Sequence, residues 1–127
     1  MEYVDLLGAR FVYGGRSVAE GFDCYGLVME MYRRRGIQLP EYQSTDEYSL
    51  IHRMINDAKP LFIEIAKPEP YCLATFMIRP PYTTHIGVVL EDGRRFIHIM
   101  QGRMVAVEWL DHAGWMKRNA GYYRWKS

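Results

Sequence analysis

Long apolar runs, cysteines and an imbalance of charge are all scarce in this sequence. No run of apolar residues approaches the length that spans a membrane, so we expect no membrane segment. Two cysteines among 127 residues are too few for a disulfide framework. A formal net charge of +1 argues against binding carried mainly by phosphate contacts, which makes nucleic acid an unexpected partner.

The N-terminus also lacks the pattern of a secretory signal, because Met1-Glu2-Tyr3 does not begin a basic segment followed by an apolar one. What the sequence does have is a globular composition, with 49% hydrophobic and 24% charged residues. Its length suits one domain, so we expect a single domain over residues 1–127. No repeat, low-complexity tract or linker interrupts it.

Periodicity and turn signals predict helices in the first half of the chain and strands in the second. Helices are expected at residues 2–8, 24–35 and 46–59, a loop or extended stretch at 10–21, strands at 61–65, 71–78, 84–90, 95–100, 104–109 and 120–125, and a helical turn at 111–117. This order favours an α+β fold in which N-terminal helices pack on a C-terminal antiparallel sheet.

The helix at residues 24–35 has the clearest boundaries. Asp23 is a good N-cap and Gly36 stands where a terminating glycine is expected. Cys24 then lies in the first turn, on the same face as the apolar Leu27 and Val28. Backbone N–H groups and the positive end of the helix dipole favour a thiolate there and could hold an oxyanion. The alternative is that Cys24 is a small buried hydrophobic residue.

Two histidines favour the reactive reading of Cys24. His85 and His98 flank a hairpin signal at Asp92-Gly93. With a two-residue loop, His85 pairs with His98 directly or is offset from it by two residues, and both rings then lie on one face of the sheet. One ring could take the thiol proton while the other fixes its tautomer. Gly87 shares this face and is expected to leave room for a helix end.

The remaining candidates are weaker. Cys72 falls in an expected strand and is interpreted as a core residue, His52 lies on the polar side of its helix, and His112 lies in the turn near the end. A zinc site built from Cys24, His85 and His98 ranks below thiol catalysis, because no two of these residues form a close ligand pair. We therefore expect no metal and no cofactor.

These residues resemble the NlpC-type cell-wall cysteine peptidases over nearly the whole chain. The segments that carry the resemblance are Phe11-Val12-Tyr13-Gly14-Gly15, Gly21-Phe22-Asp23-Cys24-Tyr25-Gly26-Leu27-Val28, Gly36-Ile37-Gln38-Leu39-Pro40, Thr84-His85-Ile86-Gly87-Val88, Phe96-Ile97-His98, Trp115-Met116-Lys117-Arg118 and Gly121-Tyr122-Tyr123-Arg124. The resemblance implies a papain-like core. It also implies a triad in which Cys24 attacks, His85 is the base and later the acid, and His98 orients His85.

The resemblance further implies a substrate, the stem peptide of peptidoglycan cut between D-glutamate and a diamino acid. It places five residues around the substrate and the oxyanion: Phe11, Tyr13, Asp23, Tyr25 and Gly87. Phe11 stands where the family usually has a tyrosine whose hydroxyl is thought to help at the site, and Phe11 has no hydroxyl to donate. Tyr13, two residues on, would share its face in an extended segment and is the candidate substitute.

Tyr25 also points to a branch of the family, because members that look phage-derived often carry an aromatic residue after the nucleophile. With Leu39-Pro40-Glu41-Tyr42 downstream, the sequence resembles the phage-tail branch. A virion tail tip, docked to a hub protein, would bring the enzyme to the cell wall without a signal peptide. Two alternatives remain open: a structural tail-tip component with a weak or inactive site, and a cytoplasmic thiol amidase or acyltransferase.

Overall fold

A six-stranded antiparallel sheet carries the fold, and two helices cover one of its faces. The computed structural model describes residues 2–42, 46–79 and 81–126. The elements in chain order are η1 (Val4–Leu6), β1 (Arg16–Ser17), β2 (Gly21–Phe22), α1 (Cys24–Arg33), α2 (Glu47–Ala58), η2 (Lys59–Leu61), β3 (Phe62–Ile65), β4 (Leu73–Phe76), β5 (His85–Val89), β6 (Arg95–His98), β7 (Ala106–Trp109), α3 (Ala113–Arg118) and β8 (Asn119–Trp125).

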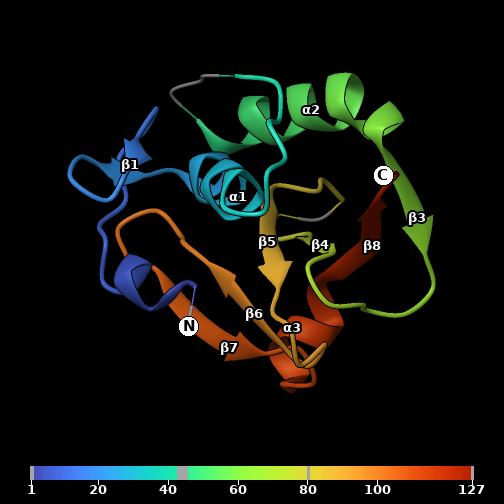
Figure 1. The fold of residues 1–127 in the computed structure, drawn as a ribbon. Coiled ribbons are helices and arrows are strands. Elements are labelled where there is room, and N and C mark those ends of the chain that lie inside the picture. Colours follow the sequence, from blue (N-terminus) through green and yellow to red (C-terminus); the bar gives the residue numbers. More distant parts are fainter. Residues whose placement is uncertain (1, 43–45, 80, 127) are drawn as a thin grey trace.

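The strand order of the sheet is β3-β8-β4-β5-β6-β7, and every neighbouring pair is antiparallel. Helix α1 packs against β5 and β6, and α2 packs against α1 and β5. Figure 1 shows α1 near the centre of the molecule and α2 running across the top. The expected α+β class, with N-terminal helices on a C-terminal antiparallel sheet, is confirmed.

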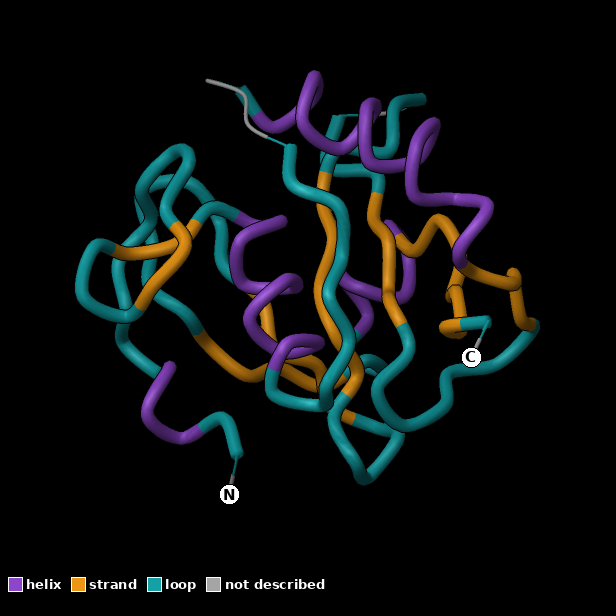
Figure 2. The backbone as a smooth tube through the Cα atoms, turned by 45° about the horizontal axis from the view of Figure 1, so that its top comes forward, coloured by secondary structure: helices purple, strands orange, loops and turns teal. Residues whose placement is uncertain are grey.

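The N-terminal segment differs from the expectation in its first element. The helix expected at residues 2–8 is only the single 3-10 turn η1, because Leu7 is extended and Gly8 has a φ of +86°, which ends the turn. The loop or extended stretch expected at residues 10–21 contains the short antiparallel pair β1 and β2. This pair packs beside α1 and is visible at one side of the molecule in Figure 2.

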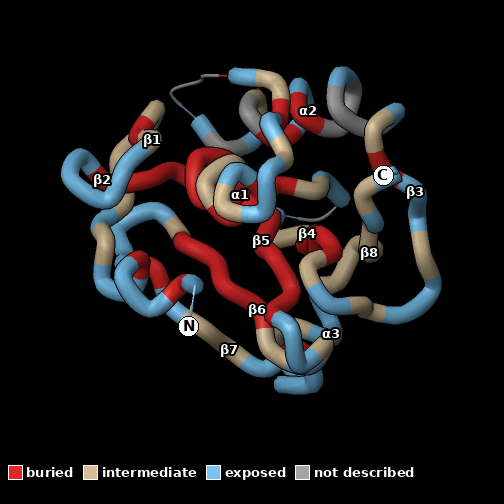
Figure 3. Tube along the Cα trace, viewed as in Figure 1, coloured by how far each residue is buried: buried red, intermediate tan, exposed pale blue. Residues whose placement is uncertain are grey.

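Helix α1 begins where its N-cap predicts and ends at Arg33, two residues before the predicted end. Asp23 is the N-cap, and its side chain accepts a hydrogen bond from the backbone N–H of Gly26. Gly36 has a φ of +80°, the left-handed conformation typical of a residue that ends a helix. The buried part of the chain runs through α1, β5 and β6, as Figure 3 shows.

The strand alternation separates the core into two clusters, one on each face of the sheet. Ile86 and Val88 of β5 belong to the cluster that contains Cys24 and the buried face of α1. Val89 of β5 belongs to the second cluster, which Trp115 of α3 joins. Because side chains alternate along a strand, His85 lies on the same face as Val89, away from Ile86.

The hairpin between β5 and β6 determines how the two histidines face. Val88 pairs with Ile97 and Val89 with Phe96, and the backbone N–H of Leu90 donates to the carbonyl of Arg95. The connection therefore has four residues rather than the expected two. An even number preserves the parity of the register, so the prediction that both rings share one face is confirmed.

Candidate active site

Asp23 fixes the start of α1 and the glycine-rich loop before it. Its Oδ1 accepts hydrogen bonds from the Gly26 N–H at 2.7 Å and from Arg16 Nη1 at 2.8 Å, and its Oδ2 accepts one from the Gly14 N–H at 2.9 Å. Asp23 is fully buried. Since both oxygens accept hydrogen bonds within the protein, Asp23 positions the backbone beside Cys24. The contact with the substrate that the resemblance implied for Asp23 stays a prediction.

A close approach between two backbone segments brings this loop onto α1. A Cβ added at Gly26 would lie 2.2 Å from the carbonyl oxygen of Gly15, far inside van der Waals contact. The helix therefore requires glycine two residues after Cys24. Arg16, the first residue of β1, also binds the Glu41 carboxylate at 2.9 Å and donates to the carbonyl of Tyr42, which ties β1 to the segment that follows α1.

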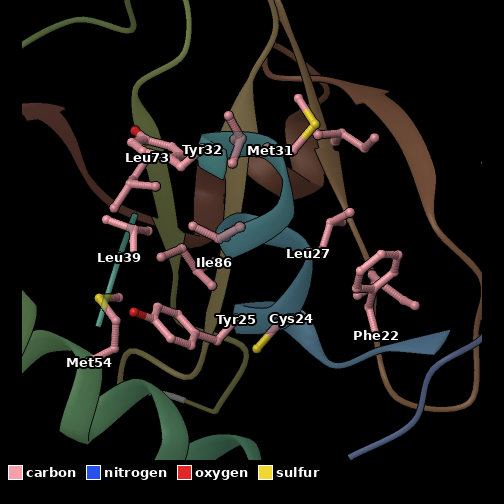
Figure 4. Close-up of a cluster of buried hydrophobic side chains, with 14 of the residues drawn as sticks. Phe22, Cys24, Tyr25, Leu27, Met31, Tyr32, Leu39, Met54, Leu73 and Ile86 are labelled. Carbon is pink, nitrogen blue, oxygen red and sulfur yellow. The ribbon is translucent and has the colours of Figure 1, made fainter. Parts of the chain in front are cut away.

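Cys24 is the first residue of α1 and is 0% exposed. Figure 4 shows its sulfur projecting from the first turn of the helix within the buried cluster, next to Tyr25. The placement expected from the sequence, in the first turn and directed inward, is confirmed. At this point the helix dipole favours a thiolate, whereas burial opposes it.

His85 and His98 form the centre of a chain of hydrogen bonds. His85 Nε2 lies 2.8 Å from His98 Nδ1, and His98 Nε2 lies 2.5 Å from Glu108 Oε2. The other carboxylate oxygen of Glu108 accepts a hydrogen bond from Trp115 Nε1 at 3.0 Å. Both histidines are buried, and the indole of Trp115 packs beside both rings.

Burial keeps the two imidazoles neutral. Desolvation, and then the neighbouring His98, lower the pKa of His85 well below its ordinary value. Desolvation also lowers the pKa of His98, although its hydrogen bond to Glu108 acts in the opposite direction. Burial alone would raise the pKa of Glu108, but hydrogen bonds from Trp115 and His98 lower it, so this carboxylate is ionised near neutrality.

Two neighbouring polar atoms have no hydrogen-bond partner. Among the described residues, Thr84 Oγ1 and His85 Nδ1 are the buried side-chain atoms left unsatisfied. Nearly all buried polar atoms in proteins are hydrogen-bonded, so a buried atom without a partner is unusual. His85 is the first residue of β5, which places its ring at the end of the strand. Of the two ring nitrogens of His85, Nε2 is therefore paired with His98 and Nδ1 has no hydrogen bond.

Cys24 and the ring of His85 pack in different parts of the core. Cys24 belongs to the cluster on the α1 face, and the His85 ring packs with Phe76 and Trp115 on the other face. His85 is the first residue of β5, so its ring lies at the end of the strand and not in its middle.

The predicted substrate-side residues are brought together only in part. The rings of Phe11 and Tyr13 meet edge to face with centroids 4.9 Å apart, as expected for two residues on one side of an extended segment. Tyr13 lines a cavity of about 270 Å³ whose other lining residues are Asp46, Tyr48, Ile78, Arg79, Thr84, Met100 and Gln101. This cavity includes Thr84, the residue directly before His85.

Tyr25 and Gly87 have different roles from those expected. Tyr25 is buried, and its hydroxyl donates to the carbonyl oxygen of Pro40 at 2.5 Å, so it holds the segment after α1. A Cβ at Gly87 would lie 2.8 Å from the carbonyl oxygen of Ile97 and 2.9 Å from the Phe96 ring. The room that Gly87 leaves is thus taken by β6 and not by a helix end.

The sequence reasoning missed Glu108 and Trp115. A signal for Glu108 existed, because the register pairs it with Phe96, two residues from His98, and so places all three on one face. Trp115 lies in a short helix, and nothing local indicates that it reaches back to the sheet.

Within residues 2–42, 46–79 and 81–126, no group of three His, Cys, Asp or Glu residues could hold a metal ion, and no helix is long and apolar enough to cross a membrane.

Comparison with known proteins gives consistent matches. A family model described as NlpC/P60 family matches residues 8–124. The chain is similar to a lipoprotein-like NLP/P60 family protein from Staphylococcus aureus, with 27% identity and a TM-score of 0.67 over 97% of this chain and 38% of that one. It is also similar to an NlpC/P60 family protein from Bacillus cereus, with 22% identity and a TM-score of 0.70 over 94% of this chain and 36% of that one. The NlpC/p60 domain of the peptidoglycan hydrolase SagA matches with 21% identity and a TM-score of 0.60 over 97% of this chain and 92% of that domain.

No curated protein matches the sequence. The chain spans well under half the length of the S. aureus and B. cereus proteins and nearly all of the SagA domain. These matches confirm the expected papain-like α+β core.

Proposed function

Because this chain belongs to the NlpC/P60 family of cysteine peptidases, we propose that it hydrolyses the stem peptides of peptidoglycan, with Cys24 as nucleophile and His85 as base. One observation carries the proposal: His85 Nδ1 is buried without a partner while His85 Nε2 is held by His98. A base with one ring nitrogen fixed and the other open is the arrangement that activates a thiol. His98 is the orienting residue.

The reaction proceeds in two halves. His85 Nδ1 takes the Cys24 proton as the sulfur attacks the peptide carbonyl, and the tetrahedral intermediate collapses when His85 returns that proton to the leaving amine. Water then attacks the thioester, again losing its proton to His85, and the acid product leaves with Cys24 restored as a thiol. Since burial lowers the pKa of His85, the resting pair is thiol and neutral imidazole, and the proton moves as the sulfur attacks.

The oxyanion is held by the backbone N–H of Cys24 and one further donor. Phe11 cannot be that donor, and the hydroxyl of Tyr13, whose ring touches Phe11, takes its place. Removing one oxyanion donor typically costs about 3 kcal/mol of transition-state stabilisation, so a poorly placed Tyr13 would lower kcat about 100-fold without changing the fold.

The cavity beside Thr84 suits the bond between D-glutamate and a diamino acid. Its lining combines the guanidinium of Arg79, the carboxylate of Asp46 and the aromatic rings of Tyr13 and Tyr48. A D-glutamyl–diamino acid segment carries a free carboxylate and a free amine, which such a lining would recognise. Asp46 also accepts a hydrogen bond from the Ser49 N–H, so Arg79 is the stronger candidate contact, with the D-glutamate carboxylate.

We also propose that the enzyme is carried on a phage tail tip, docked to a hub protein. The two sequence features typical of that branch touch each other: the Tyr25 hydroxyl bonds to the Pro40 carbonyl, and the Tyr25 ring lies 5.4 Å from that of Tyr42. Because Tyr25 and the 39–42 segment contact each other, the two features form one structural unit. This supports the proposal that the chain belongs to the phage-tail branch. Co-purification with virions, lost after removal of tails, would test this placement.

Digestion of purified peptidoglycan tests the activity. Wild-type protein should release muropeptides with new amine termini on the diamino acid, detected by mass spectrometry, and Cys24→Ala should release none. Cys72→Ala is the matched control, because Cys72 is also buried but lies in the other core cluster. If wild type and Cys24→Ala behave alike, the peptidase proposal is wrong and a structural tail-tip role is favoured. Acyl transfer to an added amine, with the cell wall left intact, would favour the amidase or acyltransferase alternative.

A further inference from the structure

The hydrogen-bond chain from His85 ends in a carboxylate, and this end determines the protonation of everything before it. An ionised carboxylate can only accept hydrogen bonds, so His98 Nε2, 2.5 Å from Glu108 Oε2, must carry a proton. A neutral His98 then has its lone pair on Nδ1. That lone pair faces His85 Nε2 at 2.8 Å, so His85 Nε2 must be the protonated nitrogen of its ring.

The consequence falls on the remaining nitrogen of His85. If Nε2 carries the proton in a neutral ring, Nδ1 carries the lone pair, and Nδ1 is one of the two buried side-chain atoms without a partner among the described residues. Without a fixed acceptor at the far end, the mirror-image arrangement would be equally possible. In that arrangement His85 Nδ1 is protonated and cannot accept a proton from a thiol.

Trp115 holds the carboxylate in place. The Glu108 side chain is 42% exposed, so alone it would lose its position readily to solvent and side-chain motion. Trp115 Nε1 donates to Glu108 Oε1 at 3.0 Å, which leaves Oε2 for His98. The same indole covers both imidazoles, with ring centroids 6.0 Å from His85 and 4.9 Å from His98. No residue of α3 is fully buried, and Trp115 is the residue of this helix that packs against the second core cluster.

We propose that Glu108, held by Trp115, is a positioning residue that sets the tautomers of His98 and His85 and so keeps His85 Nδ1 ready to accept the thiol proton. The assignment rests on the peptidase function proposed above. It extends the line of interacting groups from three residues to five: Cys24, His85, His98, Glu108 and Trp115. The negative charge of Glu108 also offsets the positive charge that His85 acquires when it takes the proton.

Nuclear magnetic resonance of the imidazole nitrogens tests the tautomers without reference to activity. In the 127-residue protein at about pH 7, where both rings are neutral, ¹H–¹⁵N correlations should show protonated Nε2 and unprotonated Nδ1 in both His85 and His98. In Glu108→Gln the single amide oxygen remains with Trp115, and the amide nitrogen donates to His98. Both rings should then switch to protonated Nδ1. Wild-type spectra with His85 Nδ1 protonated would overturn the proposal.

Kinetics on a stem-peptide substrate provide the second test. Glu108→Gln should lower kcat about 100-fold while KM stays nearly constant, because the loss is one of tautomer and not of binding. Trp115→Phe, which keeps a ring over the histidines but removes the donor to Glu108, should lower kcat about 10-fold. Glu64→Gln is the matched control, since Glu64 is an exposed glutamate on the opposite edge strand, β3, and should leave kcat unchanged.

The two tests separate the possible failures. A wild-type kcat in Glu108→Gln, or an equal loss in Glu64→Gln, would overturn the positioning role. If the tautomers are as assigned and switch in Glu108→Gln but the wild-type protein cleaves no stem peptide, the proposed function fails while the assignment of Glu108 stands.

Discussion

Acidification should destabilise this protein through its buried histidines. Folding places His85 and His98 where burial lowers the pKa of each, whereas the unfolded chain exposes both to water. As pH falls below about 6.5, the unfolded state binds protons that the folded state resists. The stability contributed by keeping these rings neutral is therefore present above that pH and is lost progressively below it, down to the folded-state pKa.

The size of the effect follows from the two buried rings. When the pH falls from about 7 to about 5, each histidine that stays neutral in the folded state lowers the free energy of unfolding by about 2 kcal/mol. His85 should contribute this full amount, and His98 a smaller one because Glu108 opposes its shift. We therefore expect a total loss of at least about 2 kcal/mol. Carboxylates with lowered pKa, such as Asp92 and Glu30, lose their contribution mostly below about pH 5 and fall outside this window.

Urea unfolding followed by tryptophan fluorescence at the two pH values measures this loss. His85→Gln keeps a side chain that can hydrogen-bond but does not titrate, so its stability should change with pH by about 2 kcal/mol less than that of wild type. His52→Gln removes an exposed histidine and should keep the wild-type change. Equal stability of wild type at both pH values would refute the reasoning, as would an equal reduction in both variants.

Three substitutions test how the site is held. Asp23→Asn should lower the unfolding free energy by about 2 kcal/mol, because an amide cannot accept from all three donors that the carboxylate serves; unchanged urea midpoints would contradict this. Tyr25→Phe should cost about 1 kcal/mol by leaving the Pro40 carbonyl without its donor, and an unaltered Tm would argue against that bond. Gly87→Ala should cost about 2–3 kcal/mol, since its Cβ would press on the backbone oxygen of Ile97, and a stable variant would show that the strands can separate there.

The parts of the fold that depend on local rules could be predicted from the sequence. Asp23 and Gly36 act within one helical turn of the helix they delimit, so the start of α1 followed directly and its end followed to within two residues. The common face of His85 and His98 followed from the two-residue period of a strand. This prediction was correct although the hairpin loop is longer than expected, because the face depends only on whether the number of loop residues is even.

The parts that depend on distant contacts could not be predicted. Tyr25 was expected beside the substrate, but its hydroxyl is taken by Pro40, fifteen residues away, and only the path of the intervening chain determines this. Trp115 reaches Glu108 because α3 folds back onto the sheet. The sequence likewise gave no indication of which face of the sheet α1 covers, and the structure places Cys24 in the core cluster on that face.

The rate at which an electrophilic thiol reagent labels each cysteine tests the central claim most directly. Both cysteines are buried, and burial raises the pKa of Cys72 to about 11, so Cys72 should react slowly near neutral pH. If His85 takes the proton of Cys24, iodoacetamide should label Cys24 at least about 100-fold faster than Cys72, and His85→Gln should remove that difference. Equally slow labelling of the two cysteines in the native protein would contradict an activated nucleophile at Cys24.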